Sequence, residues 1–595
     1  MTMAENRGSR STRRTASTAR PATSRTRPRT STGWFPKAGE DPIIPTCKRI
    51  ARAAALLALG AAWSVPAQAY DSRNALADYA RARVADASGE IAVAARGYAA
   101  ALAEAPFDEA LAARAYRRAV AAGDRTLALQ AARSLDGANA LPPDGRFLFL
   151  IEALEDGDWA EARRVVDRIE EEQLFESLVP VLRAWIAYGA NDGDPIAILD
   201  AGRDGGTPAA YSAEHRALLL IAQRQFEEGT AAISGLASLG PARFLRARLS
   251  AASRLARSRQ RDEALALLPG NSRAEIAARA LIQRGRTVPG AADSAADGIA
   301  EVFIRLAAEV NRRDVSALAL TLARFATFLA PDNSSGWFVT SAILDNAGQD
   351  AAALAALDHV DERDPFFADV QDMRVQLLAE TEDAAAALAL AQERAEENGA
   401  NAADWQRLGE QLALMDRYGE AADAYGRALA LAGGEDAPWT AWILYGGALL
   451  DGGQWEDARP ALERAVELAP DSAVALNYLG YALLERREDL GRAEELIRRA
   501  AELDPGSASI IDSLGWVHYV QGNIDEAIPM LESAARGEPA EPTINEHLGD
   551  AYWTVGRRRD ARFAWQAALV SAEDEAAERI REKLDIGLTA ETASP

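Results

Sequence analysis

Four histidines and a single cysteine are the residues with the most specific chemistry in this chain of 595 amino acids. A zinc site needs two ligands about one helical turn apart together with further ligands, whereas His215, His359, His518 and His547 are widely spaced. The sequence also contains no phosphate-binding loop, nucleophile elbow, dinucleotide-binding turn or metalloprotease motif. We therefore expect no metal site, no cofactor and no enzyme activity, and we expect the histidines to be ordinary helix residues.

Aromatic and acidic side chains recur together towards the end of the chain, where they could bind another protein. The candidate residues are Asn477, Tyr481, Asp512, Trp516, Tyr519, Glu546, Asp550 and Trp553. Aromatic anchors beside carboxylates would hold an extended peptide or a helix. The alternative is that these rings only seal one helical unit against the next, because large aromatic side chains are mostly buried.

Residues 243–286 contain eleven arginines and three acidic residues, in a chain whose net charge is −24. The candidate docking residues are Arg243, Arg246, Arg248, Arg254, Arg257, Arg259 and Arg261. Such a stretch could dock an acidic partner or anionic headgroups. The alternative is a solvated face that pairs with acids on neighbouring units. The acidic balance of the whole chain argues against nucleic acid as a partner, because binding phosphates requires basic surface.

The first 69 residues have the composition of a targeting segment. Residues 1–46 hold nine Lys/Arg and three acids among many Ser, Thr and Pro, which predicts a disordered basic leader. Residues 47–69 have a basic start, an apolar core of 13 residues and a small-residue cleavage motif, as a signal peptide does. We expect export to the periplasm or cell envelope. Cleavage would remove Cys47, and no later stretch is apolar enough for a transmembrane segment.

A period of about 34 residues organises the rest of the chain. One small or apolar residue marks the first helix of each unit: Ala82, Tyr116, Leu150, Ala184, Ala217, Ala252, Ala307, Ser341, Val375, Gly409, Gly446, Gly480, Gly515 and Gly549. Gly or Ala is expected where the second helix crosses the first, since a larger side chain would push the two axes apart. Such units bury their apolar faces only by stacking, so the pattern predicts an all-α solenoid.

The clearest unit resembles the tetratricopeptide repeat, with Trp405, Leu408 and Gly409 on a first helix and Ala421 and Tyr425 on a second. The resemblance implies a right-handed superhelical solenoid of about fourteen helix-turn-helix repeats in two arrays. The expected domains are an N-terminal degenerate array at 70–278, a linker at 279–299, a C-terminal array at 300–575, and a capping helix with a tail at 576–595. In this family the outer side of each first helix lines a concave groove, where the eight candidate protein-binding residues would lie.

The last three repeats are similar to those of bacterial cell-envelope tetratricopeptide proteins that act as adaptors for a carboxyl-terminal processing protease. The motifs are Asn477-Tyr478-Leu479-Gly480-Tyr481, Asp512-Ser513-Leu514-Gly515-Trp516 and His547-Leu548-Gly549. The resemblance implies a protein-binding scaffold or adaptor in the envelope, although the chain lacks the lipid-bearing cysteine of those lipoproteins. The alternative is a structural subunit of a polysaccharide-secretion or outer-membrane assembly complex. The expected partners are other proteins, among them an envelope protease or a secretion complex.

Overall fold

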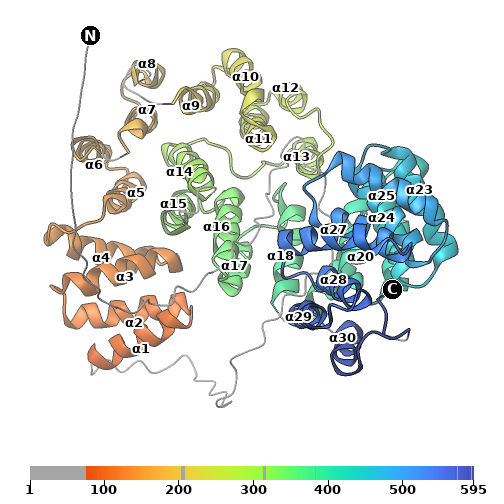
Figure 1. Ribbon diagram of the computed structural model, residues 1–595. Helices are drawn as coiled ribbons and strands as arrows, with labels where there is room; N and C mark the ends of the chain where they lie inside the picture. Colours follow the sequence, from red (N-terminus) through yellow and green to blue (C-terminus); the bar gives the residue numbers. More distant parts are fainter. Residues whose placement is uncertain are drawn as a thin grey trace, which may run out of the picture. The chain divides into compact units, whose positions relative to one another are not determined.

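The computed structural model describes residues 75–594 apart from 174, 203–207, 312–315, 382, 398, 573 and 591 (Figure 1). The leader, the signal peptide and Cys47 lie outside the described residues. Within the described ranges the chain forms helices and no β-strand, which confirms the all-α prediction. No helix in this part of the chain is long and apolar enough to cross a membrane.

The N-terminal half consists of consecutive helix pairs followed by one further helix. Its helices are α1 (Ala75–Ala87), α2 (Ile91–Glu104), α3 (Glu109–Ala122), α4 (Arg125–Gly137), α5 (Arg146–Asp156), α6 (Trp159–Glu171), α7 (Val179–Ala190), α8 (Pro195–Ala201), α9 (Ala209–Ala222), α10 (Phe226–Ser234), α11 (Pro241–Arg257), α12 (Arg261–Ala266) and α13 (Arg273–Gln283). Short 3₁₀ helices precede α5, α7, α11 and α22.

The C-terminal half continues with helix pairs and ends in a single helix. Its helices are α14 (Ala295–Asn311), α15 (Ser316–Leu329), α16 (Ser334–Asn346), α17 (Asp350–Leu357), α18 (Phe367–Glu380), α19 (Ala384–Glu396), α20 (Ala402–Ala413), α21 (Tyr418–Leu431), α22 (Trp439–Asp451), α23 (Trp455–Leu468), α24 (Ala473–Glu485), α25 (Leu490–Leu503), α26 (Ala508–Val520), α27 (Ile524–Gly537), α28 (Pro542–Thr554), α29 (Arg558–Ala568) and α30 (Asp574–Ile586). Each of the fourteen marker residues is buried on the first helix of a pair.

The glycine markers show why the repeat pattern requires a small residue. A Cβ atom on Gly480 would lie 2.7 Å from Ile497 Cγ1, and one on Gly549 would lie 2.3 Å from Trp565 Cδ1. Both contacting side chains belong to the second helix of the same pair. The second helix therefore crosses directly over the marker, as ridges-into-grooves packing at short interaxial distance requires.

Side-chain caps fix where many of the helices begin. Asp108, Asp158, Ser472 and Ser507 each accept a hydrogen bond from the backbone N–H three residues later. These caps satisfy backbone donors that have no partner inside the helix. Ser472 and Ser507 cap the successive first helices α24 and α26, whereas α28 begins without a side-chain cap.

Helices α14 and α15 pack against the first helices of the preceding repeats. Helix α14 contacts α5, α7 and α9, and α15 contacts α3 and α5 (Figure 1). One apolar core joins residues from α1–α9 to residues of α14–α16. Phe147 of α5 meets Phe303 of α14 edge to face at 5.0 Å, and both rings contact Phe325 of α15.

The predicted linker at 279–299 overlaps the end of one helix and the beginning of the next. Helix α13 extends to Gln283 and α14 begins at Ala295, so the stretch without helix is confined to 284–294. Helices before and after this stretch share a core. For example, Gly298 of α14 packs on Trp185 of α7, and a Cβ atom at Gly298 would lie 2.1 Å from the indole. The local repeat period contains no information about this contact between distant helices.

Candidate protein-binding groove

The candidate protein-binding residues occupy equivalent positions on three successive first helices, α24, α26 and α28. Relative to the marker glycine, they stand three residues before it, one residue after it and, in two repeats, four residues after it. This spacing places them on one side of each helix. Their contacts, described below, extend from one helix to the next, so they form a continuous strip, which we call the groove strip.

Three aromatic rings stack at the centre of the groove strip. Trp516 lies between Tyr519, at a centroid distance of 4.4 Å, and His547 of the next repeat, at 3.9 Å. Both neighbours are within 10° of parallel to the indole. Trp516 is only 2% exposed, so it cannot serve as the free anchor predicted from the sequence. Tyr519 is half-buried, and its hydroxyl lies 3.1 Å from Thr554 Oγ1.

Asp512 and His547 form a buried pair that leaves one polar atom of each without a partner. His547 Nδ1 lies 2.9 Å from Asp512 Oδ2. This pair links the first helices of two successive repeats, α26 and α28. Among the described residues, neither His547 Nε2 nor Asp512 Oδ1 has a hydrogen-bond partner, and the same holds for Asn477 Oδ1.

The electrostatics of the strip are set by burial and by clustered carboxylates. Burial, together with the nearby charges of Glu485 and Asp512, raises the pKa of Tyr481 well above its usual value. Burial also raises the pKa of Glu485, against the opposing effect of His547. The strip therefore combines an un-ionised phenol with acidic groups in a poorly hydrated setting, where a donated hydrogen bond is stronger than in water.

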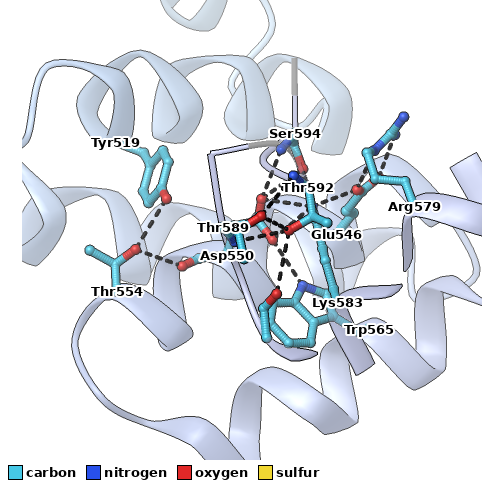
Figure 2. A network of polar contacts seen from close by, with 11 residues as sticks. Tyr519, Glu546, Asp550, Thr554, Trp565, Arg579, Lys583, Thr589, Thr592 and Ser594 are labelled. Carbon is cyan, nitrogen blue, oxygen red and sulfur yellow. Dashed lines mark hydrogen bonds and ion pairs between the residues drawn. The ribbon is translucent and has the colours of Figure 1, made fainter. Parts of the chain in front are cut away.

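In the last repeat, the residues at the equivalent positions, Glu546 and Asp550, form hydrogen bonds and ion pairs with other residues of the chain (Figure 2). Lys583 of α30 places its Nζ 2.6 Å from Glu546 Oε1 and 2.8 Å from Asp550 Oδ2. Arg579 donates two further hydrogen bonds to Glu546, at 2.8 and 2.9 Å. Although burial opposes ionisation of Glu546, hydrogen bonds from Arg579 and Lys583 outweigh it, so the pKa of Glu546 is lowered.

Trp553, the last candidate anchor, is also covered by the chain. Its ring contacts Trp565 at a centroid distance of 5.2 Å, and the Arg558 guanidinium lies 3.8 Å from its centroid. On Gly587, just after α30, a Cβ atom would lie 2.0 Å from Trp553 Cζ2. The segment after α30 therefore packs directly on this indole.

The structure thus brings the eight candidate residues together, but they differ in what they offer to a partner. Asn477 and Asp512 keep unpaired polar atoms, whereas Glu546 and Asp550 are fully engaged. Three contributors were missed from the sequence: Glu485, His547 and Lys583. Glu485 stands five residues after its marker glycine, and His547 is adjacent to Glu546, so the repeat register could have indicated both. Lys583 lies outside the repeats and has no such register.

The seven arginines of the candidate docking patch are largely paired within the chain. Arg243 pairs with Glu214 of α9, Arg246 with Glu301 of α14, and Arg248 with Glu275 of α13 at 2.9 Å. Arg254 and Arg257 both pair with Asp293, and Arg261 donates to the Gln283 carbonyl oxygen. Arg259 is exposed. The stretch therefore serves mainly to join α11 to α9, α13 and α14, and it is not a free basic surface.

His215 and His359 pack against tryptophans of the chain. His215 is fully buried, and its Nδ1 accepts a hydrogen bond from Trp185 Nε1 at 3.1 Å. His359 stacks on Trp337 at 3.8 Å. Within the described ranges, no group of three or more His, Cys, Asp or Glu is arranged to hold a metal ion.

Family models match the part of the chain that contains the groove strip. Two tetratricopeptide-repeat models cover residues 399–471, and 446–508 together with 513–578. Residues 399–508 and 513–578 therefore match the tetratricopeptide repeat, as the sequence resemblance implied.

Curated relatives match over short segments. A TPR repeat-containing protein of Pseudomonas aeruginosa is 42% identical over 81 residues, which is 14% of this chain and 14% of the relative. The human mitochondrial import receptor subunit TOM70 is 31% identical over 93 residues, 16% of this chain and 15% of the relative. The cytochrome c-type biogenesis protein CycH of Pseudomonas aeruginosa is 32% identical over 133 residues, 21% of this chain and 32% of the relative. The chain thus spans a third or less of the length of these relatives.

Solved tetratricopeptide structures also align with parts of the chain. One from Thermus thermophilus is 25% identical and aligns along its full length with 31% of this chain, at a TM-score of 0.28. One from Parabacteroides merdae is 12% identical, with 98% of that structure covering 43% of this chain at a TM-score of 0.37.

Proposed function

We propose that this protein is a scaffold or adaptor that binds segments of other proteins along the groove strip of α24, α26 and α28. The observation that supports this best is the row of buried polar atoms without partners on Asn477, Asp512 and His547. A buried polar group without a hydrogen bond costs about 1–3 kcal/mol. A partner that donates to these groups would recover that free energy once neighbouring side chains move aside to admit it, because the atoms are buried in the unbound chain.

The chemistry of the strip indicates the kind of segment that fits. The unpaired oxygens of Asn477 and Asp512 are acceptors, so the partner must present donors, such as backbone N–H groups of an extended segment or a basic side chain. Tyr481 and Tyr519 flank these acceptors with apolar ring surface, which suits a peptide that is partly apolar. Similarity to an import receptor subunit and to a biogenesis protein favours a function in handling other proteins.

The composition of residues 1–69 favours a place in the bacterial cell envelope. There the partner of an adaptor would be an envelope protease, by the resemblance of the last three repeats to adaptors of that kind. Co-purification of a protease supports this assignment. Co-purification of secretion or outer-membrane assembly subunits instead assigns the chain to a structural role in such a complex.

Replacing Asn477 tests the groove without breaking a hydrogen bond of its Oδ1, which has no partner among the described residues. We expect Asn477→Ala in the full-length chain to reduce capture of the native partner about 5- to 30-fold, the equivalent of one lost hydrogen bond. The matched control is Asn523→Ala, since Asn523 is exposed in the turn before α27. Equal capture by the two variants, with equal helicity by circular dichroism, contradicts the proposal.

A further inference from the structure

Lys583 has surroundings unlike those of any other basic residue described. The chain contains three lysines, Lys37, Lys48 and Lys583, within a total of 65 basic residues. Lys583 is 0% exposed, and its ammonium group contacts Glu546, both oxygens of Asp550, and Ser594 Oγ at 2.6–2.9 Å. A compact ammonium with three donors fits this enclosed space, which a planar guanidinium would not.

Ser594 closes this site from the segment that follows α30, of which residues 587–590 and 592–594 are described (Figure 2). Its backbone N–H donates to Asp550 Oδ2 at 3.1 Å, and its hydroxyl donates to the same oxygen at 2.8 Å. The segment turns back at Gly587, whose φ of +90° suits a residue without a side chain. It then runs across Trp553 and buries Thr592.

The groups that this segment covers are the last-repeat members of the groove strip. Asp550 stands at the position of Tyr481 and Trp516, and Glu546 at the position of Asn477 and Asp512. In the two preceding repeats, the residues equivalent to Glu546 are Asn477 and Asp512, and each has an oxygen without a hydrogen-bond partner. In the last repeat, Arg579 and Lys583 of α30 pair with Glu546 at this position. The segment after α30 supplies a backbone N–H and a hydroxyl to the neighbouring carboxylate of Asp550, and these are the donors we expect from a bound partner.

We propose that the segment after α30 is an intramolecular ligand of the groove, bound at its last repeat in the place of a partner segment. This inference rests on the proposed function and specifies it further. The site at Asp550 accepts an extended peptide with a serine or threonine whose N–H and hydroxyl both reach the carboxylate. A partner that extends into the last repeat must displace residues 587–594, so the segment competes with such partners.

Lys583 provides a direct readout of displacement, because its amine reacts with acylating reagents only when it is exposed. In the full-length chain, we expect Ser594→Leu to raise the acetylation rate of Lys583 about tenfold, since a larger apolar side chain does not fit between Asp550 and Lys583. The matched control is Ala593→Leu, because Ala593 is exposed. Its acetylation rate should stay close to that of the wild-type chain in mass spectrometry.

A synthetic peptide of residues 587–594 with blocked ends tests whether the site is a binding site and not only a structural clasp. We expect it to bind the Ser594→Leu chain and restore Lys583 protection, and to bind the wild-type chain at least about tenfold more weakly because the site is filled. A peptide in which Thr592 and Ser594 are both replaced by alanine should not bind. If Ser594→Leu lowers helicity, a chain ending at Ile586 takes its place in the same measurements.

Two results overturn the inference: unchanged Lys583 acetylation when Ser594 is replaced, or failure of the peptide to bind the opened site. Neither measurement uses a native partner. The inference can therefore fail while the Asn477→Ala experiment supports partner binding. It can also succeed while that experiment contradicts partner binding, so the two proposals are tested separately.

Discussion

Side chains from the second helix fill the space that a Cβ atom would need at Gly409, Gly446, Gly480, Gly515 and Gly549. The closest contact is at Gly549, where the indole of Trp565 crosses the helix. Trp565 is fully buried, and its Nε1 donates to Asp550 Oδ1 at 2.9 Å. The indole of Trp565 thus packs on the marker Gly549 and also holds Asp550 of the groove strip by a hydrogen bond.

Gly549→Ala is expected to destabilise the last repeat by about 1–3 kcal/mol, because Trp565 cannot move away from a new Cβ without losing its hydrogen bond. Denaturant unfolding followed by tryptophan fluorescence measures this change. Gly419→Ala is the control, since nothing lies within 4 Å of a Cβ at that exposed helical position. The control should be neutral or more stable by up to about 1 kcal/mol. Equal stability of the two variants would contradict this account of the marker.

His215 is expected to make the N-terminal half sensitive to mild acid. Burial lowers the pKa of His215 from about 6.5 to about 3, so in this range the unfolded chain takes up a proton that the folded chain does not. Stability should therefore fall as the pH drops below 6.5, by about 2 kcal/mol between pH 7 and pH 5. His215→Asn keeps an acceptor for Trp185 but does not titrate, so this part of the pH dependence should disappear. Identical pH profiles of the two proteins would rule out the assignment.

At the scale of elements, α14 joins the two halves of the chain. Its Arg305 pairs with Glu214 of α9 at 2.7 Å, and its Glu301 pairs with Arg246 of α11. Its apolar face enters the core shared by α5 and α7. The face of the N-terminal repeats that meets α14 and α15 is therefore used for internal packing, and the groove strip of α24, α26 and α28 is where partner binding is proposed.

A fragment of residues 75–283 should fold poorly, because it lacks the α14 and α15 side chains that complete its core. A fragment of residues 75–346 retains α14–α16 and should unfold cooperatively. Circular dichroism and binding of a hydrophobic dye distinguish the two, since exposed apolar surface binds the dye. Similar cooperative unfolding and equally low dye binding would show that the N-terminal repeats are independent of α14.

The sequence allowed the helical class and the first helix of each pair to be predicted, because Gly or Ala at the crossing point is a local requirement that repeats in register. It also placed the eight candidate residues at equivalent positions of successive first helices, and their exposure to a partner in a groove stays a prediction. Three features could not be predicted: the packing of Gly298 on Trp185, the pairing of Arg246 with Glu301, and the closure of Asp550 by Lys583 and Ser594. Each joins residues 33 or more positions apart, and hydrophobic periodicity describes only local structure.

At the scale of the whole molecule, charge distinguishes the arginine-rich stretch from the groove strip. Five of the seven candidate arginines, Arg243, Arg246, Arg248, Arg254 and Arg257, pair with acids of the same chain, which reduces the attraction of this patch for an acidic partner. The groove strip instead presents acceptors and carboxylates at Asn477, Asp512 and Glu485. A partner should therefore present hydrogen-bond donors or positive charge. A partner long enough to reach Asp550 should compete with residues 587–594 of the chain for that carboxylate.

Site-specific photo-crosslinking in cells that naturally make the protein tests the central claim most directly. The crosslinking residue p-benzoylphenylalanine replaces either the half-buried Tyr519 of the groove strip or the exposed Glu467 on the second helix α23. We predict covalent capture of a protein partner from position 519, reduced by Asn477→Ala, and little or no capture from position 467. Capture from position 467 alone, or capture from position 519 that Asn477→Ala leaves unchanged, would contradict binding in the groove.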